Sequence, residues 1–169
     1  MHKNYEITKG FGTDGQAGLE GENQMRRARP MKIRVMIVRE GRPTEAELSN
    51  PQAVYQFMKP KCRRLDREHF WRIDLDARSR VLGYEVVSVG TISASLVHCR
   101  EVFKGAILNN AAAFIIAHNH PSGDTTPSAE DKDVTRRIQR AGELMGIVLL
   151  DHMILADKSF FSFKEAGIM

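Results

Sequence analysis

Hydrophobic and charged residues alternate from Trp71 to Asp76, in the segment Trp-Arg-Ile-Asp-Leu-Asp. Successive side chains of a strand point to opposite faces, so this alternation is typical of a strand with one buried face. The pattern therefore predicts a half-buried strand over residues 69–76. Its predicted inner positions are Trp71, Ile73 and Leu75, and its predicted outer positions are Arg72, Asp74 and Asp76.

Five other segments complete the strand prediction. Residues 31–38 and 81–89 are rich in β-forming residues, and the second of these is placed to form a hairpin with the alternating segment. Residues 111–117 form a wholly apolar run, which a strand buried on both faces requires. Residues 147–155 predict a further apolar strand, and residues 160–166 predict a short strand followed by a helical turn.

Apolar residues at helical spacing predict three helices, over residues 51–60, 99–108 and 128–145. Asn50 followed by Pro51 is a helix-start signal, and Gly146 is placed to end the third helix. Because helices and strands alternate through the second half of the chain, we expect an α/β fold in which a mixed sheet packs against helices.

The composition is that of one soluble domain with some spare length. Of the 169 residues, 42% are hydrophobic and 27% are charged. No apolar run approaches the ~18 residues that cross a bilayer, and the N-terminus does not read as a signal peptide, so we expect a cytoplasmic protein without a membrane partner. Two cysteines, Cys62 and Cys99, exclude a disulfide scaffold or a cysteine-rich zinc ribbon. Any metal ion would therefore be held by histidine and carboxylate.

Basic residues gather in two groups, although the net charge is only +4. Such groups can meet phosphate, so nucleic acid is one candidate partner. A solvated basic face is the interpretation we prefer, because aromatic residues are not interleaved with these groups as single-strand binding requires. The groups are Arg26, Arg27, Arg29, Lys32 and Arg34, and then Lys59, Lys61, Arg63, Arg64 and Arg67.

The candidate chemistry lies directly after the apolar run. In extended backbone, residues i and i+2 share a face, so His118 and His120 can reach one ion while Asn119 points away. Ser128 is placed to cap the following helix, and Asp131 in its first turn can face back toward the histidines. Two histidines and one aspartate are ligands that zinc accepts, with a fourth position left for a water that becomes nucleophilic at neutral pH.

Each signal alone has a plainer explanation. Ser-x-x-Asp is more often a simple helix cap than a metal ligand, and a lone histidine at a strand end is usually structural. Both signals together, separated by seven residues, favour a single-zinc hydrolytic site. Asp151 and His152 also follow an apolar strand and could face the same cleft, but we expect His152 to be a core histidine.

The motif His-x-His, seven residues and Ser-x-x-Asp resembles the signature of the JAMM metalloproteases, also called JAB or MPN+. Its form here, His118-Asn119-His120-Pro121-Ser122-Gly123-Asp124, resembles the bacterial RadC-like branch, and agreement extends from about Glu68 to Met169. The resemblance implies an α/β JAB/MPN domain, a curved mixed β-sheet flanked by helices, over residues 67–169. Residues 30–66 would supply a strand and a helix leading into it. Residues 1–29, rich in Gly, Asn and charge, predict a flexible arm.

The same resemblance implies the roles of the site residues. His118, His120 and Asp131 would bind one zinc ion per chain, and Ser128 would hydrogen-bond the developing oxyanion. Glu68, just before the first core strand, would act as general base and then as general acid. The leading hypothesis is a zinc-dependent metallopeptidase or isopeptidase that acts on a peptide or protein substrate.

Two other function classes remain open. The letters His-Asn-His and the basic charge suggest a nuclease or a DNA-repair-associated metal-binding protein. HNH nucleases, however, spread these residues over a ββα-metal element, whereas here they are contiguous. RadC-like proteins also carry an N-terminal segment resembling helix-hairpin-helix modules, which we do not expect in this chain. A scaffold without catalysis is the other alternative, and the presence of all three ligands argues against it.

Overall fold

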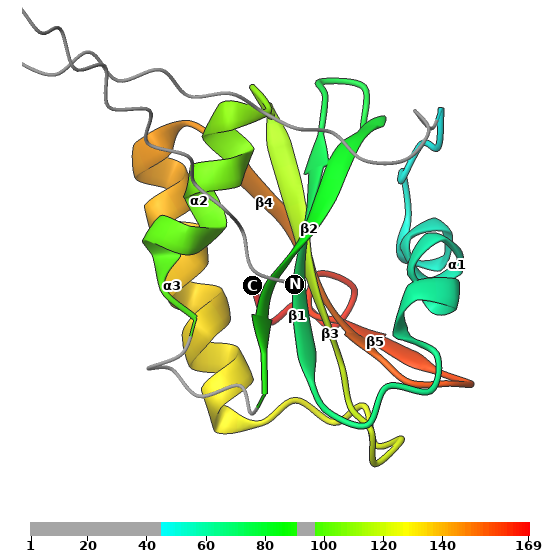
Figure 1. The fold of residues 1–169 in the computed structure, drawn as a ribbon. Coiled ribbons are helices and arrows are strands. Elements are labelled where there is room, and N and C mark those ends of the chain that lie inside the picture. The colour runs from blue at the N-terminus through cyan, green and yellow to red at the C-terminus, as the bar shows by residue number, and fades with distance from the viewer. Residues whose placement is uncertain (1–44, 91–96) are drawn as a thin grey trace, which may run out of the picture. The chain divides into compact units, whose positions relative to one another are not determined.

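A computed structural model describes residues 45–90 and 97–169, and within these ranges five strands form one mixed sheet (Figure 1). The strands are β1 (His69–Leu75), β2 (Val81–Val89), β3 (Ala113–Asn119), β4 (Val148–Leu155) and β5 (Phe160–Ser162). Their order across the sheet is β2-β1-β3-β4-β5. β3 and β4 run parallel, and the other neighbours pair antiparallel, which confirms the predicted hairpin of β1 and β2. The arm and the first strand predicted from sequence lie outside the described residues.

Helices cover both faces of this sheet. α1 (Pro51–Cys62) lies on one face, while α2 (Cys99–Leu108) and α3 (Ala129–Met145) lie on the other, as Figure 1 shows. This three-layer arrangement confirms the predicted α/β fold class. α1 begins at the predicted Asn50 cap and ends two residues beyond Pro60, and α3 ends at Gly146 in the left-handed region with φ 67°. None of the helices in the described ranges has the length and apolar character needed to traverse a bilayer.

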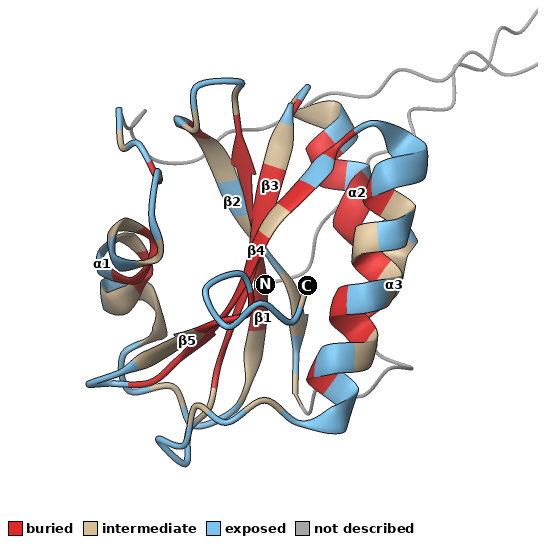
Figure 2. Cartoon of the chain, turned by 180° about the vertical axis from the view of Figure 1, so that it is seen from behind, coloured by how far each residue is buried: buried red, intermediate tan, exposed pale blue. Residues whose placement is uncertain are grey.

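The sheet divides the apolar interior into two clusters. Alternate residues of β3 supply the two sides, because Ile115 packs toward α1 whereas Phe114 and Ile116 pack toward α2 and α3. Figure 2 shows buried residues concentrated along the central strands and on the inner sides of the helices. His118 follows this alternation and lies on the α3 side of the sheet, fully buried.

β1 corrects one prediction, because it is buried on both faces rather than on one. Arg72 and Asp74 are 1% and 0% exposed. The Arg72 guanidinium donates to the Asp74 carboxylate at 2.6 and 3.0 Å and to the carbonyl of Val102 in α2 at 2.8 Å. α2 lies over this face, and Gly105 leaves room for the guanidinium, since a Cβ there would collide with it. Alternating charge thus marks a buried ion pair here and not a solvated face.

The connection from β3 through α3 to β4 positions the candidate site. Parallel strands need such a crossover, and it brings the first turn of α3 beside the carboxyl end of β3. The histidines at the end of β3 and the aspartate at the start of α3 therefore meet at one edge of the sheet.

Candidate metal centre

His118 and His120 lie where β3 leaves the sheet. Phe70 of β1 pairs with His118, and its ring stacks on the imidazole with centroids 6.3 Å apart. His118 is fully buried, whereas the His120 side chain keeps 14% of its surface exposed. Asn119 points to the opposite face as expected, and its amide bridges the backbone of His69 and Arg67.

The start of α3 orients the third side chain. Ser128 caps the helix, because its hydroxyl oxygen accepts from the Asp131 N–H at 3.0 Å. In return, Asp131 Oδ2 accepts from the Ser128 N–H at 2.8 Å and from the Ser128 hydroxyl at 2.7 Å. This capping box holds one carboxylate oxygen. The other, Oδ1, is thereby directed to within 3.3 Å of His118 Nε2.

The three side chains form a group that can hold a metal ion. Each of His118, His120 and Asp131 offers one ligand atom, and these atoms lie within 4.8 Å of one another. His118 Nε2 lies 3.0 Å from His120 Nε2. The sequence motif and the folded geometry thus select the same three residues.

A buried chain of hydrogen bonds sets the proton positions on His118. The Thr135 hydroxyl donates to the Asp131 carbonyl at 2.6 Å, because a carbonyl oxygen can only accept. Thr135 Oγ1 also lies 2.6 Å from His152 Nδ1, so this nitrogen must supply the proton. His152 Nε2 is then a bare acceptor for His118 Nδ1, 2.9 Å away. His118 Nδ1 therefore carries the proton, and its Nε2 presents a lone pair to the centre.

His120 also presents a bare Nε2, and a single hydrogen bond of its other ring nitrogen is enough to explain this. Its Nδ1 lies 2.6 Å from the Asp124 carbonyl oxygen and donates to it. In the neutral ring, His120 Nε2 is consequently bare. With His120 in this form, two nitrogen lone pairs and the Oδ1 of Asp131 face one another. Such a set of acceptors needs a cation, and the three residues fit a metal ion for this reason.

Burial keeps the two inner rings neutral. It lowers the pKa of His118 from 6.5 to about 4, an effect to which His120 adds and which the Asp131 charge opposes. Burial likewise lowers the pKa of His152 well below 6.5, and His118 and His120 add to that shift. Below these pKa values the rings would carry charge, so at neutral pH both hold the single proton that the hydrogen-bond chain requires.

Glu68 precedes β1 and lies outside the group of three. Its carbonyl accepts from the Gly90 N–H at 2.9 Å. β1 and β3 pair antiparallel with Phe70 opposite His118, so the same register continued by two residues sets Glu68 opposite His120. Residues i and i+2 share a face, which puts Glu68 on the histidine face of the sheet. Its role in proton transfer stays a prediction, as does that of Ser128, whose hydroxyl proton is donated to Asp131.

Sequence reasoning placed His152 correctly in the core but missed its contact with His118. It also passed over Thr135, which connects His152 to the first turn of α3. One signal was available for Thr135, because it follows Asp131 by four residues and so shares its helix face. No local signal could connect His152 to His118, since the two residues are 34 positions apart on neighbouring strands.

Comparison with known proteins matches residues 48–168 to the RadC-like JAB domain. A UPF0758 protein of Symbiobacterium thermophilum is 50% identical over 123 residues, which cover 73% of this chain and 53% of the relative. A UPF0758 protein of Methanosarcina mazei is 45% identical over 123 residues, with 73% and 54% covered. The chain thus spans about half the length of the curated relatives it matches, and these names state no activity.

Proposed function

This chain belongs to the family of RadC-like JAB domains, and from that premise we propose that it is a zinc-dependent hydrolase, a metallopeptidase or isopeptidase of the JAMM type. The observation that carries the proposal is the meeting of three bare acceptor atoms, from His118, His120 and Asp131, at one edge of the sheet. The other ring nitrogen of each histidine and the other carboxylate oxygen of Asp131 already have hydrogen-bond partners, so these three atoms are left for a metal ion.

The distances between the three ligand atoms support zinc. Tetrahedral ligands at about 2.1 Å from an ion lie roughly 3.4 Å from one another. His118 Nε2 lies 3.0 Å from His120 Nε2 and 3.3 Å from Asp131 Oδ1, which is close to that separation. The nearest Asp131 oxygen to His120 Nε2 is Oδ2, 3.9 Å away, so this third pair is wider. Two imidazoles and one carboxylate also form the kind of three-ligand set that catalytic zinc uses while it keeps a position for water or substrate.

Each residue then has a distinct task in amide hydrolysis. Bound zinc would supply Lewis acidity, polarising a carbonyl and lowering the pKa of a water to about 7. Glu68 would take the proton from the attacking water and return it to the leaving amine. The Ser128 hydroxyl, exposed at the start of α3, would turn from Asp131 to donate to the developing oxyanion.

The nuclease alternative has weaker support. HNH nucleases build their metal site on a ββα element, whereas here His118 lies on β3, in the middle of a five-strand sheet, and His120 directly follows that strand. A DNA-repair-associated role would need a nucleic-acid surface, and the exposed basic residues alone do not establish one.

The proposal is tested by metal analysis of the purified full chain, followed by cleavage profiling against peptide libraries. We expect about one zinc per chain. The double variant His118→Ala/His120→Ala should lose it, whereas His98→Ala should keep it, because exposed His98 lies outside the group of three ligands. Full zinc occupancy in the double variant would contradict the site, and a zinc-loaded protein that cleaves no peptide would contradict the proposed reaction.

A further inference from the structure

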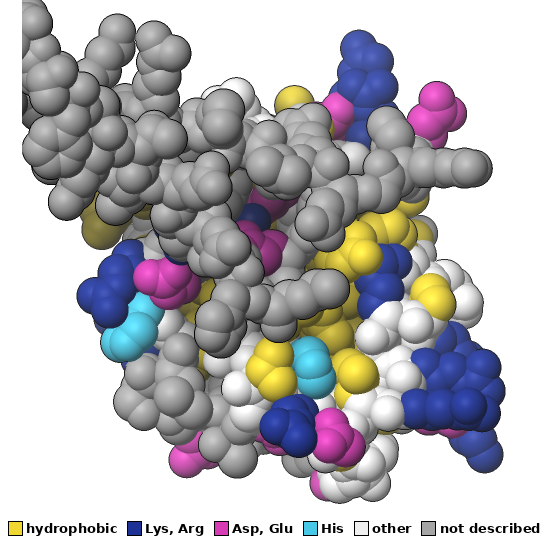
Figure 3. All heavy atoms as spheres, viewed as in Figure 1, with side chains coloured by type: hydrophobic (Ala, Val, Ile, Leu, Met, Phe, Trp, Pro, Cys, Tyr) yellow, Lys and Arg dark blue, Asp and Glu magenta, His cyan; other side chains and the backbone are white. Residues whose placement is uncertain are grey.

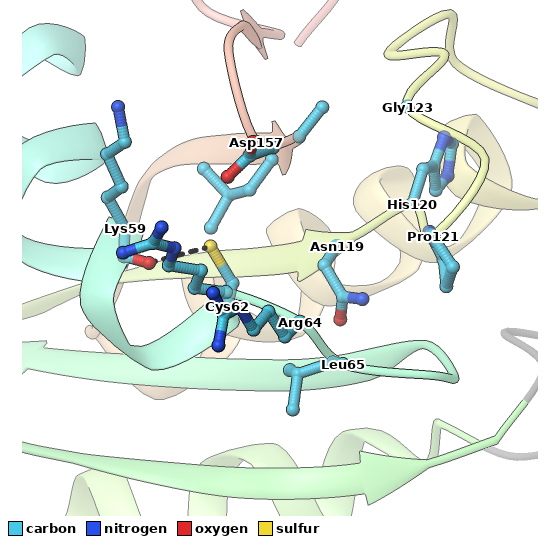
Figure 4. Close-up of a pocket in the computed structure, with 12 residues that line it drawn as sticks. Lys59, Cys62, Arg64, Leu65, Asn119, His120, Pro121, Gly123 and Asp157 are labelled. Carbon is cyan, nitrogen blue, oxygen red and sulfur yellow. Dashed lines mark hydrogen bonds between the residues drawn. The ribbon is translucent and has the colours of Figure 1, made fainter.

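A cavity of about 430 Å³ opens beside His120, in the range of pockets that bind small ligands. Figure 4 shows its two walls, with Lys59, Cys62 and Arg64 at the end of α1 on one side and Asn119, His120 and Pro121 at the end of β3 on the other. Asp157, just after β4, completes the lining.

His120 connects this cavity to the metal centre. Its Nε2 belongs to the group of three ligand atoms, and the same residue lines the cavity. The His118 ring, by contrast, is fully buried on the α3 side of the sheet. Asn119, Leu65 and Leu155 place the cavity on the α1 side of the sheet. A substrate whose reacting amide lies at the metal centre would therefore have to cross the sheet edge at His120 to place a neighbouring group in the cavity.

The walls of the cavity carry mainly positive charge. Lys59, Arg63 and Arg64 line it against one carboxylate, Asp157, so the cations outnumber the carboxylate by three to one. Arg63 and Arg64 are exposed, and in the described part of the chain neither has a salt bridge or side-chain hydrogen bond. Figure 3 shows Lys and Arg side chains gathered near α1, at the right of the view. Three of the five residues of the second basic group thus line the cavity.

The backbone of Arg64 is a second, independent observation. It has φ 61°, in the left-handed region that favours glycine, two residues beyond the end of α1. A glycine at this position would adopt the same backbone without strain from a side chain. The chain instead carries an arginine there, as a lining residue of the cavity.

We infer that this cavity binds a carboxylate side chain next to the scissile amide, so that the preferred substrate is an acidic peptide. The inference rests on the proposed hydrolase function and extends it to substrate choice. Guanidinium groups bind carboxylates through paired, charge-assisted hydrogen bonds. Apolar lining residues such as Leu65 and Leu155 suit the methylene groups of such a side chain.

A peptide fits these walls better than a nucleic acid. The described lining contains no Phe, Tyr or Trp on which a base could stack. Asp157 would also repel a continuous phosphate backbone, whereas a single carboxylate can bind on the arginine side and avoid it. A free phosphate or an oligonucleotide nevertheless shares the anionic chemistry, so both belong in the test as competitors.

The test uses the zinc-loaded full chain and matched fluorescent peptides that carry Glu, Gln or Lys on either side of the cleaved bond. We expect kcat/KM to be at least about tenfold higher for Glu than for Gln on one side, and the ratio should fall as salt rises. Arg64→Gly keeps a residue suited to the left-handed backbone, so it should fold and lose most of this preference. Arg63→Gln should act in the same direction. Arg78→Gln, in the turn after β1, is a matched control that should change nothing.

Binding of the same peptides, followed by fluorescence anisotropy, separates the two proposals. Cleavage without a preference for Glu would overturn the acidic subsite and leave the peptidase proposal standing. If no peptide is cleaved, the peptidase proposal fails. In that case, selective binding of the Glu peptide that Arg64→Gly removes would still support the acidic subsite. Equal binding of the Glu and Gln peptides would overturn the subsite. The labelled acidic peptide can also be displaced by an oligonucleotide or by the same peptide without label. If the oligonucleotide displaces it at the lower concentration, the proposal that the cavity binds a peptide carboxylate is overturned.

Discussion

His152 should control metal affinity although it touches no ion. The substitution His152→Leu keeps a side chain of similar bulk but removes the acceptor, 2.9 Å away, for the Nδ1 proton of His118. That proton can then move to Nε2, where it blocks the lone pair that faces Asp131. Loss of such an orienting partner typically weakens metal binding by about 10- to 100-fold, which corresponds to roughly 1.4–2.8 kcal/mol. In either proton position, the buried Nδ1 of His118 is left without a partner, which should also cost about 1–3 kcal/mol of folding free energy.

Competition with a zinc chelator measures the first effect, and denaturant unfolding of the metal-free protein measures the second. Thr135→Val is the matched control, because it removes the next partner along the chain while His152 still accepts from His118. Its loss of zinc affinity should be smaller than that of His152→Leu. Nitrogen NMR of the His118 ring should show Nδ1 protonated in the wild type. If His152→Leu lowers stability but leaves the zinc affinity and this NMR signature unchanged, His152 only fills space and the proton chain is wrong.

Three further predictions concern catalysis, the buried ion pair and the N-terminal arm. Glu68→Gln should keep about one zinc per chain but lower kcat by roughly 10²–10⁴, because the amide cannot accept the water proton; loss of zinc would instead make Glu68 a ligand. Asp74→Ala should lower the free energy of unfolding by about 3–5 kcal/mol, since it removes the fully buried partner of the Arg72 charge and leaves it only the partly exposed Glu85 carboxylate, 3.1 Å away. Glu101→Ala breaks a solvent-exposed pair with Lys104 and should change stability little, so equal losses in urea unfolding would refute the burial argument. Deleting residues 1–29 should leave metal content and the thermal midpoint unchanged, and a large drop in the midpoint would show that the arm packs on the domain.

The local parts of this site could be predicted from sequence. A strand, a turn and a helix start place His118, His120 and Asp131 together, and each of these elements has its own short-range signal. The 14 residues from His118 to Asp131 therefore carry nearly all the information that the group of three needs. The mixed sheet also followed from the alternation of apolar segments, because an α/β chain has few ways to bury them. Of the six predicted strands, the five that fall within the described residues form this sheet.

The remaining parts depend on contacts between distant segments. The burial of Arg72 requires α2 to lie over β1 with a glycine at the contact, and neither condition is visible in the alternation of β1 itself. The cavity likewise needs the end of α1 beside the end of β3, although Arg64 and His120 are 56 positions apart. Charge patterning predicted a solvated face both for the charged residues of β1 and for the basic residues at the end of α1. It was wrong for Arg72, which is buried, and it did not anticipate the cavity beside Arg63 and Arg64.

The two histidines divide the site into a fixed side and an open side. His118 lies in the core, held through His152 and Thr135 to the backbone of α3, so its lone pair keeps one direction. The His120 ring donates from Nδ1 to the Asp124 carbonyl in the loop that follows β3, and the residue borders the cavity. A metal ion bound between them would therefore have a rigid inner ligand and an outer ligand next to the substrate. This asymmetry follows from the sheet itself, because His118 lies within β3 on the side that α3 covers, whereas His120 is the first residue past the end of β3.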